Sequence, residues 1–413
     1  MNKEVFISNR KRLMERVEDN SLVILFAGNA PKKSADEAYP FTPNRNFYYL
    51  TGIDEEEHII TLRKKDNKVE EVLFIKKPDL EKEKWLGKTI RKNEAIEISG
   101  VDEVKYLEEF LPFVHSSIIT NGITNIWLDL ERDSFNEDAT YTEKFAKKLM
   151  RKYPYVNIKC IYNYIAELRL VKSEEEVKEI RKAIRVTIDG VEMLMKHAKP
   201  GIKEYELEAY FDFVCKKEGA KDYAIKTIAA AGKNAAVLHY VANNSEINDG
   251  DLILFDLGAQ VNYYNGDISR TIPANGKFEG RKKDVYNAVL RVNEKIIDAI
   301  KPGANWGKIN EMANDLLAEE MIGLGLIKDK KDYRKYYWHS IGHSLGLDCH
   351  DVGPRWVDLK PGMIFTVEPG LYIEEEGIGV RIEDDVLVTE DGNEVLTKEM
   401  IKSVEEIENF MAK

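Results

Sequence analysis

The sequence predicts two α/β domains, residues 1–165 and 166–413, the second built from two copies of one α/β unit. Three observations support this fold class. The chain has 413 residues, of which 43% are hydrophobic, and this is enough to fill two separate cores. Short β-rich runs alternate with charged helical stretches as far as about residue 165. Beyond that point, a helix pair followed by an apolar strand occurs twice.

The first domain is predicted from its alternation of strand and helix patterns. The predicted strands are residues 21–27, 58–62, 72–75 and 124–129, and the predicted helices are residues 3–17 and 143–152. The apolar run that starts at Leu22 is far shorter than the roughly 20 residues that a membrane span needs, and acidic Glu18 and Asp19 precede it. We therefore expect a buried strand there and no association with a membrane.

The net charge and the cysteine content indicate which partners the protein can bind and in which cellular compartment it works. Asp and Glu number 73 against 61 Lys and Arg, so the net charge of −12 repels nucleic-acid phosphates and anionic lipids. The three cysteines, Cys160, Cys215 and Cys349, lie far apart in the sequence. This usage argues against a disulfide framework and a thiolate metal site. It predicts a cytoplasmic protein that does not bind nucleic acid.

The second domain is predicted to open with a long amphipathic helix. Ser173 and Glu176 have the spacing of a capping box, in which each side chain bonds a backbone N–H at the start of a helix. Apolar residues follow at steps of three and four, at positions 177, 180, 184, 188, 191 and 195. Such spacing gives a helix one continuous face to bury against a core.

The second domain contains a repeated order of elements. One helix ends at residues 199–201 (Lys-Pro-Gly), and another ends at the same tripeptide at residues 301–303. A second helix follows each of them, and then an apolar strand that leads to an acid, Asp256 in the first copy and Glu368 in the second. Each acid stands six residues after one glycine and two before another. The duplication therefore places a carboxylate at the same position of both copies.

A further acid follows each of these strands. Asp267 comes eleven residues after Asp256, and Glu383 comes fifteen residues after Glu368. A chain reversal at residues 261–262 would make Asp256 and Asp267 face each other across an antiparallel pair, because both are then equally far from the turn. Residues 265–266 (Asn-Gly) are the stronger local turn signal and do not favour this register. The repeat supports the pairing of Asp256 with Asp267, so we predict that register, with a bulge at residues 265–266 beside the site.

Three of the seven histidines fall in one twelve-residue stretch, at His339, His343 and His350. Glycines between them allow the backbone to approach a ligand closely. Imidazole together with several carboxylates suits Mn, Co, Fe or Zn rather than Ca or a soft metal. Four carboxylates can hold two divalent cations with little net charge remaining, and such a pair, roughly 3.5–4 Å apart, activates a water. The sequence therefore predicts a dinuclear metal site.

Each of these residues also has an ordinary structural explanation. A strand-end acid such as Asp256 is more often a cap or an ion-pair partner than a metal ligand. Asp267 has Arg270 as a candidate partner, and Glu383 has Arg381. A single loop histidine is more often hydrogen-bonded than metal-bound. The presence of all of them in one domain, with two acids at equivalent repeat positions, favours the metal site.

Several segments carry a resemblance to known enzymes. They are residues 256–258 (Asp-Leu-Gly), 266–271 (Gly-Asp-Ile-Ser-Arg-Thr), 339–353 (the histidine-rich stretch), 366–372 (Thr-Val-Glu-Pro-Gly-Leu-Tyr) and 379–384 (Gly-Val-Arg-Ile-Glu-Asp). These segments resemble the pita-bread metallopeptidases, and among them the aminopeptidase P family. In the first domain, residues 46–54 and 84–87 resemble the creatinase-like amino-terminal domain of that family. The implied fold is thus a creatinase-like α/β domain followed by a pita-bread catalytic domain with two pseudo-symmetric α/β halves.

The resemblance implies a role for each matching residue. The implied metal ligands are Asp256, Asp267, His343, Glu368 and Glu383. The resemblance implies that Asp267 and Glu383 bridge both ions. The implied substrate and second-layer histidines are His239, His339 and His350. Glu368 also matches the proposed general base. Arg381 is a candidate to orient the site or the substrate, with ion pairing to neighbouring acids as its alternative role.

The activity that the resemblance implies is that of an Xaa-Pro aminopeptidase. Such an enzyme releases the amino-terminal residue from peptides with proline in second position, by attack of a metal-activated hydroxide. We expect two divalent ions per chain, Mn²⁺ first, with Co²⁺ or Zn²⁺ as alternatives. We also expect a homodimer or homotetramer that uses the first domain. Trp85 and residues 47–49 are expected in the core, with a subunit contact or the substrate rim as alternatives.

Three other functions remain open. The first alternative is prolidase, which cleaves only Xaa-Pro dipeptides and must bind their free carboxylate, a contact that Arg355 could supply. Methionine aminopeptidases share the five ligands but usually lack a large amino-terminal domain. A non-catalytic binding protein on the same fold is the alternative from another class. Such relatives have lost ligands, whereas all five ligand positions are intact here.

Overall fold

The structure, a computed structural model, describes residues 1–132, 134–354 and 356–412. It divides into two units, Met1–Arg169 and Leu170–Lys413. Among the helices of the described residues, none is long and apolar enough to cross a membrane. Arg355, the residue considered for binding a substrate carboxylate, lies outside the described residues.

The first unit is a mixed sheet covered by helices. Its strands are β1 (Ser21–Phe26), β2 (Lys32–Ser34), β3 (Glu37–Ala38), β4 (Ile59–Lys65), β5 (Lys68–Ile75), β6 (Glu103–Tyr106), β7 (Asn125–Leu128) and β8 (Asn157–Cys160). Its helices are α1 (Lys3–Arg16), α2 (Arg45–Thr51), α3 (Leu80–Leu86), α4 (Lys92–Ser99), α5 (Phe110–Ile119), α6 (Tyr141–Lys152) and α7 (Tyr162–Leu170), with a 3-10 turn at Leu107–Glu109. The predicted strands and helices of this domain are confirmed as β1, β4, β5, β7, α1 and α6.

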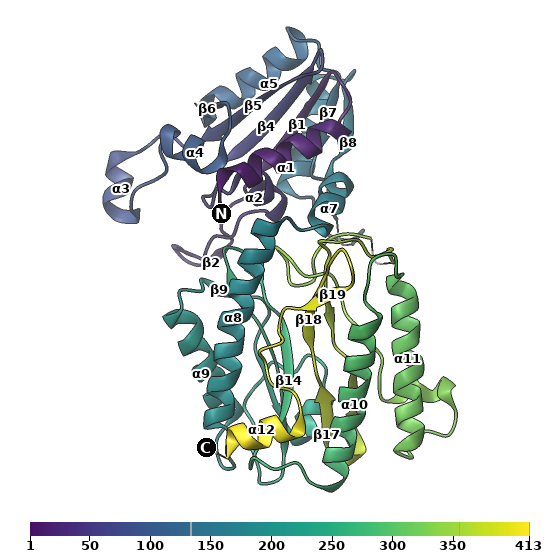
Figure 1. Cartoon of the computed structure of the whole chain (residues 1–413). Helices are drawn as coiled ribbons and strands as arrows, with labels where there is room; N and C mark the ends of the chain where they lie inside the picture. The colour runs from purple at the N-terminus through teal and green to yellow at the C-terminus, as the bar shows by residue number, and fades with distance from the viewer. Residues whose placement is uncertain (133, 355, 413) are drawn as a thin grey trace. The chain divides into compact units, whose positions relative to one another are not determined.

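The main sheet of this unit has the strand order β6-β5-β4-β1-β7-β8. Apolar residues of β1 alternate between its two faces. Leu22 and Ile24 join a core with Phe110 of α5 and Phe145 of α6. Figure 1 shows α1 crossing the near face of the same sheet. Residues 47–49 are buried as expected, whereas Trp85 on α3 is 87% exposed, so the expectation of a core position for Trp85 is wrong.

The second unit carries its strands between pairs of long helices. The helices are α8 (Glu174–His197), α9 (Glu204–Lys217), α10 (Gly280–Ala299), α11 (Trp306–Gly323) and α12 (Val404–Met411), with 3-10 helices η2 (Gly232–Ala236), η3 (Lys330–Lys335) and η4 (Glu374–Glu376). The strands are β9 (Asp222–Tyr223), β10 (Ile228–Ala231), β11 (Leu252–Leu257), β12 (Ala259–Val261), β13 (Tyr264–Asn265), β14 (Ile268–Pro273), β15 (Ile364–Val367), β16 (Gly370–Ile373), β17 (Ile378–Arg381), β18 (Asp384–Val388) and β19 (Asn393–Val395).

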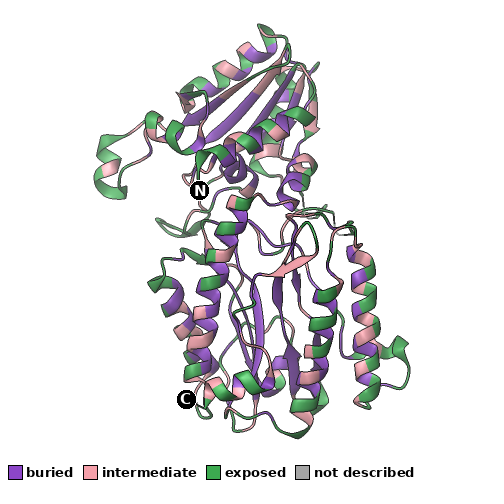
Figure 2. Ribbon diagram, viewed as in Figure 1, coloured by how far each residue is buried: buried purple, intermediate pink, exposed green. Residues whose placement is uncertain are grey.

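The opening helix of this unit forms as its sequence predicts. The Ser173 hydroxyl accepts the N–H of Glu176, and the Glu176 carboxylate accepts the N–H of Ser173, which completes the capping box. All six predicted apolar positions of α8 are buried. Figure 2 shows the same arrangement across the unit, with buried residues on the central strands and on the inward sides of the helices.

The predicted duplication is confirmed by the order of elements. The helices α8 and α9 precede β11, and α10 and α11 precede β15. In Figure 1 the two helix pairs flank the central strands on opposite sides. Asp256 lies near the end of β11, and Glu368 directly follows β15. Each copy thus brings one acid to the end of its apolar strand.

The first hairpin has a different register from the predicted one. Asp256 pairs with Ser269 rather than with Asp267, and the turn is centred on Asn262 and Tyr263. Both turn residues have positive φ, 49° and 68°, as in a two-residue type I′ turn. Tyrosine is rarely found in that conformation, which is why the sequence pattern did not indicate the turn.

The predicted bulge at residues 265–266 is also wrong. The pairs Leu257–Ile268 and Gln260–Asn265 are both centred on the same turn, so no extra residue is inserted between them. The ladder is interrupted instead at Gly258, where a Cβ would lie 1.9 Å from the carbonyl oxygen of Gly266. Asp267 follows this close approach and directly precedes the return strand β14 beside the site.

Candidate metal centre

A cavity of about 640 Å³ in the second unit brings the predicted residues together. Its lining includes every residue for which the sequence suggested a metal or catalytic role: Asp256, Asp267, Glu368, Glu383, His239, His339, His343, His350 and Arg381. Trp306 and Phe365 add an apolar wall, with ring centroids 4.3 Å apart. A concave site of this size with a few convergent polar groups is typical of a small-ligand pocket.

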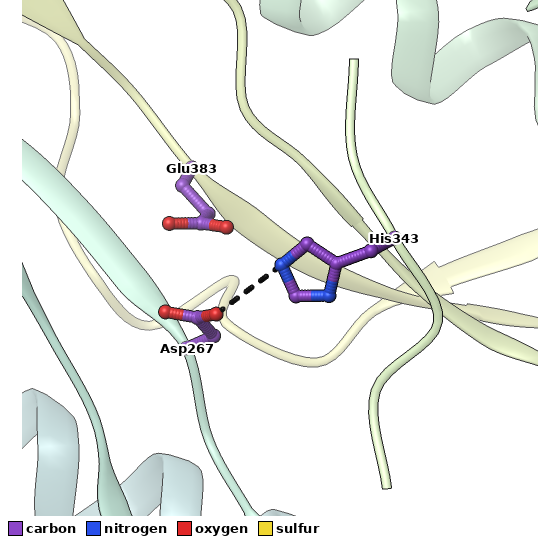
Figure 3. A group of neighbouring side chains, drawn as sticks. All are labelled: Asp267, His343 and Glu383. Carbon is purple, nitrogen blue, oxygen red and sulfur yellow. Dashed lines mark ion pairs between the residues drawn. The ribbon is translucent and has the colours of Figure 1, made fainter. Parts of the chain in front are cut away.

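Asp267, His343 and Glu383 form the tightest group in the cavity. One ligand atom of each lies within 4.8 Å of the others. Figure 3 shows the imidazole pointing toward both carboxylates, which come from separate strand ends. His343 Nε2 lies 3.5 Å from Asp267 Oδ2 and 3.8 Å from Glu368 Oε1. The arrangement offers one nitrogen and several oxygen donors around one small volume.

A backbone contact of the ring nitrogen that faces away from the acids fixes the orientation of the His343 ring. Its Nδ1 lies 3.1 Å from the carbonyl oxygen of Ser344, which places a proton on Nδ1 and turns Nε2 toward the acids. Gly342 makes this approach possible, because a Cβ there would lie 2.0 Å from the carbonyl oxygen of Thr366. Burial lowers the pKa of His343, but its contacts with Asp267 and Glu368 outweigh burial and raise the pKa to about 9. The ring is thus in strongly negative surroundings.

Asp267 has an unsatisfied oxygen. Its Oδ2 accepts from the thiol of Cys349 at 2.9 Å, and its backbone N–H donates to Asp385. Its Oδ1 is buried and has no hydrogen-bond partner among the described residues. A buried carboxylate oxygen without a partner is costly, and a cation is one of the few groups that can compensate it. This oxygen therefore fits a metal ligand.

Asp256 is held by Ser269 and Arg381. The Ser269 hydroxyl lies 3.1 Å from Asp256 Oδ1 and 2.8 Å from Glu383 Oε2, and Arg381 Nε donates to it at 2.7 Å. Arg381 Nη2 lies 2.6 Å from Asp256 Oδ2. The ordinary pairings considered for the other acids do not form in the described structure, because Arg270 pairs with Asp384 and Arg381 pairs with Asp256.

A chain of hydrogen bonds links Arg381 to His339. Arg381 Nη1 donates to the hydroxyl of Tyr372 at 3.0 Å, and this hydroxyl lies 2.9 Å from His339 Nε2. His339 Nδ1 lies 2.8 Å from the carbonyl oxygen of Ser340 and 3.7 Å from Glu368 Oε2. Burial and the charge of Arg381 lower the pKa of His339 to about 3, so the ring is neutral. The chain fixes both ring nitrogens of His339 beside Glu368.

The four acids carry more negative charge than the described side chains compensate. Burial raises the pKa of Asp256, raises that of Glu368 to about 7 and raises that of Glu383 well above its usual value, and the acids repel one another. Divalent cations would remove this repulsion. The donor set of carboxylate oxygens and one imidazole nitrogen fits Mn, Co, Fe or Zn.

His350 and His239 lie at other parts of the cavity lining. The rings of His350 and His343 meet edge to face with centroids 4.2 Å apart. His239 is exposed and lies in the segment that follows η2. Both are therefore placed to contact a ligand in the cavity.

The segment that carries His239 is anchored by Glu204. The Glu204 side chain is fully buried at the start of α9 and accepts from the N–H of Ala231 at 2.8 Å, the N–H of Ser245 at 2.9 Å and the Tyr240 hydroxyl at 2.8 Å. Tyr240 is the residue after His239. Glu204 thus fixes both ends of this segment and the side chain beside the histidine.

Three residues of the site were not singled out from the sequence. Ser269 and Tyr372 stand inside the segments on which the resemblance rests, and their hydroxyls hold Asp256, Arg381 and His339. The hairpin places Ser269 opposite Asp256, but the register predicted from the sequence put Asp267 there, so Ser269 was missed. Cys349 precedes His350 and contacts Asp267. The wide spacing of the three cysteines in the sequence did not indicate that Cys349 belongs to the site.

Comparisons with known proteins agree with this geometry. Metallopeptidase family M24 matches residues 178–390, and the N-terminal domain of aminopeptidase P matches residues 6–127. The Xaa-Pro aminopeptidase of Escherichia coli (strain K12) is 33% identical over 437 residues, covering 100% of this chain and 98% of that protein.

Solved structures extend the similarity to the whole chain. A putative aminopeptidase P from Bacillus anthracis is 50% identical, with a TM-score of 0.98 over 100% of this chain and 99% of that chain. Zinc-substituted aminopeptidase P from Escherichia coli in complex with product is 32% identical, with a TM-score of 0.92 over 100% of this chain and 98% of that chain. The chain therefore belongs to metallopeptidase family M24, with an aminopeptidase P N-terminal domain ahead of a pita-bread catalytic domain.

Proposed function

We propose that the chain is an Xaa-Pro aminopeptidase, which releases the amino-terminal residue from peptides with proline in second position. The observation that carries the proposal is the group of Asp267, His343 and Glu383 in the lining of a cavity that Asp256 and Glu368 also line. Full-length similarity to an Xaa-Pro aminopeptidase and to aminopeptidase P structures supports this choice over the other M24 activities.

The proposed cofactor is a pair of divalent cations, Mn²⁺ first and Co²⁺ or Zn²⁺ as alternatives. The residues that would hold them are the four acids and the imidazole: Asp256, Asp267, Glu368, Glu383 and His343. The unpartnered Oδ1 of Asp267 and the Nε2 of His343, which faces the acids, support these assignments. Such a pair, when bound, supplies a nucleophilic water at neutral pH and charge stabilisation for the oxyanion.

The chain's own residues would complete the reaction. Glu368 would accept the proton of the attacking water and pass it to the departing proline nitrogen. His239 or His350 would donate to the developing oxyanion from the cavity wall. His339 would orient Glu368, because its ring is held by Tyr372 and Ser340. Arg381 would hold Asp256 in place rather than contact the substrate.

Hydrolysis of three peptide classes tests the proposed specificity. The Mn²⁺-loaded chain is assayed with Xaa-Pro dipeptides, Xaa-Pro-Xaa tripeptides and Met-Ala-Xaa tripeptides, with Asp267→Ala as the inactive control. We expect cleavage of the tripeptides that contain proline. Cleavage of the dipeptide alone would make the chain a prolidase, and preference for Met-Ala-Xaa would make it a methionine aminopeptidase. Prolidase is thus the alternative that this assay separates most sharply.

Metal analysis separates the enzyme from a binding protein on the same fold. The purified chain is supplied with Mn²⁺, and bound metal is counted after desalting. We expect two ions per chain. Fewer than one ion per chain, together with no hydrolysis of any peptide, would favour the binding protein.

We further propose a homodimer or homotetramer that uses the first unit. Leu80, Trp85 and Leu86 of α3 are 70%, 87% and 85% exposed, and exposed apolar residues clustered in this way are typical of a subunit contact. Light scattering of wild type and Trp85→Glu tests this, and an unchanged mass in the variant would contradict the role of α3. We also infer a cytoplasmic location, since the described cysteines are all unpaired, which suits a reducing compartment.

A further inference from the structure

The strand pair that carries Glu368 and Glu383 opens at the two acids. The β15–β18 ladder ends at the pair Val367–Asp384, and the β16–β17 ladder begins at Gly370–Arg381. Between them one backbone bond joins the two chains, from the N–H of Ile382 to the carbonyl oxygen of Pro369 at 3.3 Å, and the described structure shows none between Glu368 and Glu383. The backbone N–H of Glu368 donates to Ile341 at 2.8 Å, and that of Glu383 donates to Ser269 at 3.0 Å. Each acid is thus turned toward a different neighbouring segment.

The carbonyl groups of the same two peptide units face a single side chain. Asn293, which is fully buried on α10, donates from Nδ2 to the carbonyl oxygen of Val367 at 3.2 Å and to that of Ile382 at 3.3 Å. These are the residues directly before Glu368 and Glu383. The peptide plane ahead of each acid is therefore held at its N–H by one partner and at its oxygen by the Asn293 amide.

Lys402 fixes which way the Asn293 amide faces. Lys402 Nζ donates to Asn293 Oδ1 at 2.8 Å and lies 2.8 Å from Asp384 Oδ2. Because the ammonium can only donate, it selects the amide oxygen and leaves the amide NH₂ group for the two carbonyls. Asp384 is also held by Arg270 at 2.8 Å. The amide is thus locked in the orientation that its two acceptors require.

We infer that Asn293 is a positioning residue for the metal site, one that sets the spacing of Glu368 and Glu383 by joining their backbones across the open part of the hairpin. This inference rests on the proposed metal site. Two glutamates from different strands can share a pair of cations only if their Cα positions are fixed relative to each other. A donor that reaches both peptide units supplies this constraint where the two acids themselves exchange no backbone bond.

Asn393 offers a matched control. Its Nδ2 also donates to two backbone carbonyls, those of Ile297 and Ile300, each at 2.9 Å. These acceptors lie at the end of α10 and in the residue after it, and neither adjoins a candidate ligand. Asn393→Ala therefore removes the same kind of contact as Asn293→Ala without touching the peptide units of the acids.

The experiment measures Mn²⁺ binding by the full chain after metal removal with a chelator. Calorimetry gives the number of sites and their affinities, electron paramagnetic resonance reports the magnetic coupling of the ion pair, and thermal unfolding of the metal-free chain reports stability alone. We expect Asn293→Ala to weaken Mn²⁺ binding by about 10- to 100-fold, the range typical of residues that support metal ligands, and to alter the coupled signal. Asn393→Ala should lower only the unfolding temperature.

Each outcome decides the inference. Equal Mn²⁺ affinity and an unchanged coupled signal in Asn293→Ala would overturn it, as would an equal loss in Asn393→Ala. If Asn293→Ala does not fold, Lys402→Met provides the test, because it frees the amide to rotate and should weaken Mn²⁺ binding in the same direction. Unchanged binding in that variant would then overturn the inference. Failure of the wild-type chain to bind Mn²⁺ is a separate result, which removes the proposed metal site itself.

Discussion

Arg381 Nη2 lies 2.6 Å from Asp256 Oδ2, and both residues are buried. The same guanidinium donates to Ser269 and Tyr372, so it joins an acid of the first repeat to the hydrogen bonds that orient His339 in the second. Asp256 and Asp267 come from the first copy, whereas Glu368 and Glu383 come from the second. The pair therefore ties the two halves of the unit at the site where their acids converge.

Loss of the Arg381 guanidinium should destabilise the metal-free protein strongly. Arg381→Met leaves Asp256 buried without its positive partner, and breaking a buried pair in this way costs about 3–5 kcal/mol. Urea unfolding of the metal-free chain measures the change. Arg185→Met is the control, because Arg185 pairs with Glu399 at 2.8 Å at the surface, where such a pair contributes about 1 kcal/mol or less. Similar losses in both variants would contradict the structural role of Arg381.

Asp267 and Glu383 should be indispensable for turnover. Either Asp267→Ala or Glu383→Ala removes a carboxylate from the tightest group in the cavity and should lower kcat by about 10³-fold or more, because the cations supply several kcal/mol of transition-state stabilisation. Hydrolysis of an Xaa-Pro-Xaa peptide at saturating Mn²⁺ gives kcat. Glu376→Ala, which changes a surface acid paired with Arg281, should leave it unaltered. Near-normal kcat in either site variant would argue against a dinuclear mechanism.

Glu204 should support peptide hydrolysis only by anchoring the segment that carries His239. Glu204→Ala leaves the N–H groups of Ala231 and Ser245 without their acceptor, which should cost about 3 kcal/mol of stability. It should also lower kcat/KM, because the segment that presents His239 loses its anchor.

A double-mutant cycle tests this route. In a His239→Ala background, Glu204→Ala should cause little further loss of kcat/KM. Glu206→Ala is the control, since Glu206 is exposed and accepts only the N–H of Lys203 among the described contacts. Fully additive losses for Glu204 and His239 would show that Glu204 does not work through the histidine.

His58 should make the first unit less stable in mild acid. Burial lowers the pKa of His58 from 6.5 to about 4, because the charged ring has little access to water beside β4. The unfolded chain binds a proton below about pH 6.5 while the folded ring stays neutral, so stability is complete above that pH and falls as the pH drops toward 4. At pH 5 the loss should be about 2 kcal/mol.

Denaturant unfolding of the first unit between pH 7.5 and pH 5 measures this dependence. His58→Gln carries no titrating ring, so its stability should change less over the same interval, whatever its absolute value. An identical pH dependence in wild type and variant would assign the effect to other groups.

Secondary structure and the site residues could be predicted from local patterns, but strand register could not. The spacing of Ser173, Glu176 and Val177 follows the helical repeat directly, so α8 was predictable. The first hairpin depends on a turn at Asn262 and Tyr263, where a buried tyrosine has a φ of 68°. No local preference indicates such a turn, and Asn265-Gly266 was the more conspicuous signal.

The ion-pair partners of the charged side chains could likewise not be predicted from the sequence. Neighbours in the chain suggested the pairs Asp267–Arg270 and Glu383–Arg381, whereas the structure pairs Arg270 with Asp384 and Arg381 with Asp256. Alternation along a strand puts residues three apart, such as Asp267 and Arg270, on opposite faces, so proximity in the sequence does not identify the partner of a charge. Asn293 lies on a helix with an ordinary amphipathic pattern, and only its contacts reveal what it joins.

Anomalous scattering from crystals grown with Mn²⁺ tests the central claim most directly. We expect two manganese peaks per chain in the cavity, both contacting the carboxylates of Asp267 and Glu383, with Asp256, Glu368 and His343 completing the ligands. A single peak, or peaks that do not contact Asp267 and Glu383, would contradict it.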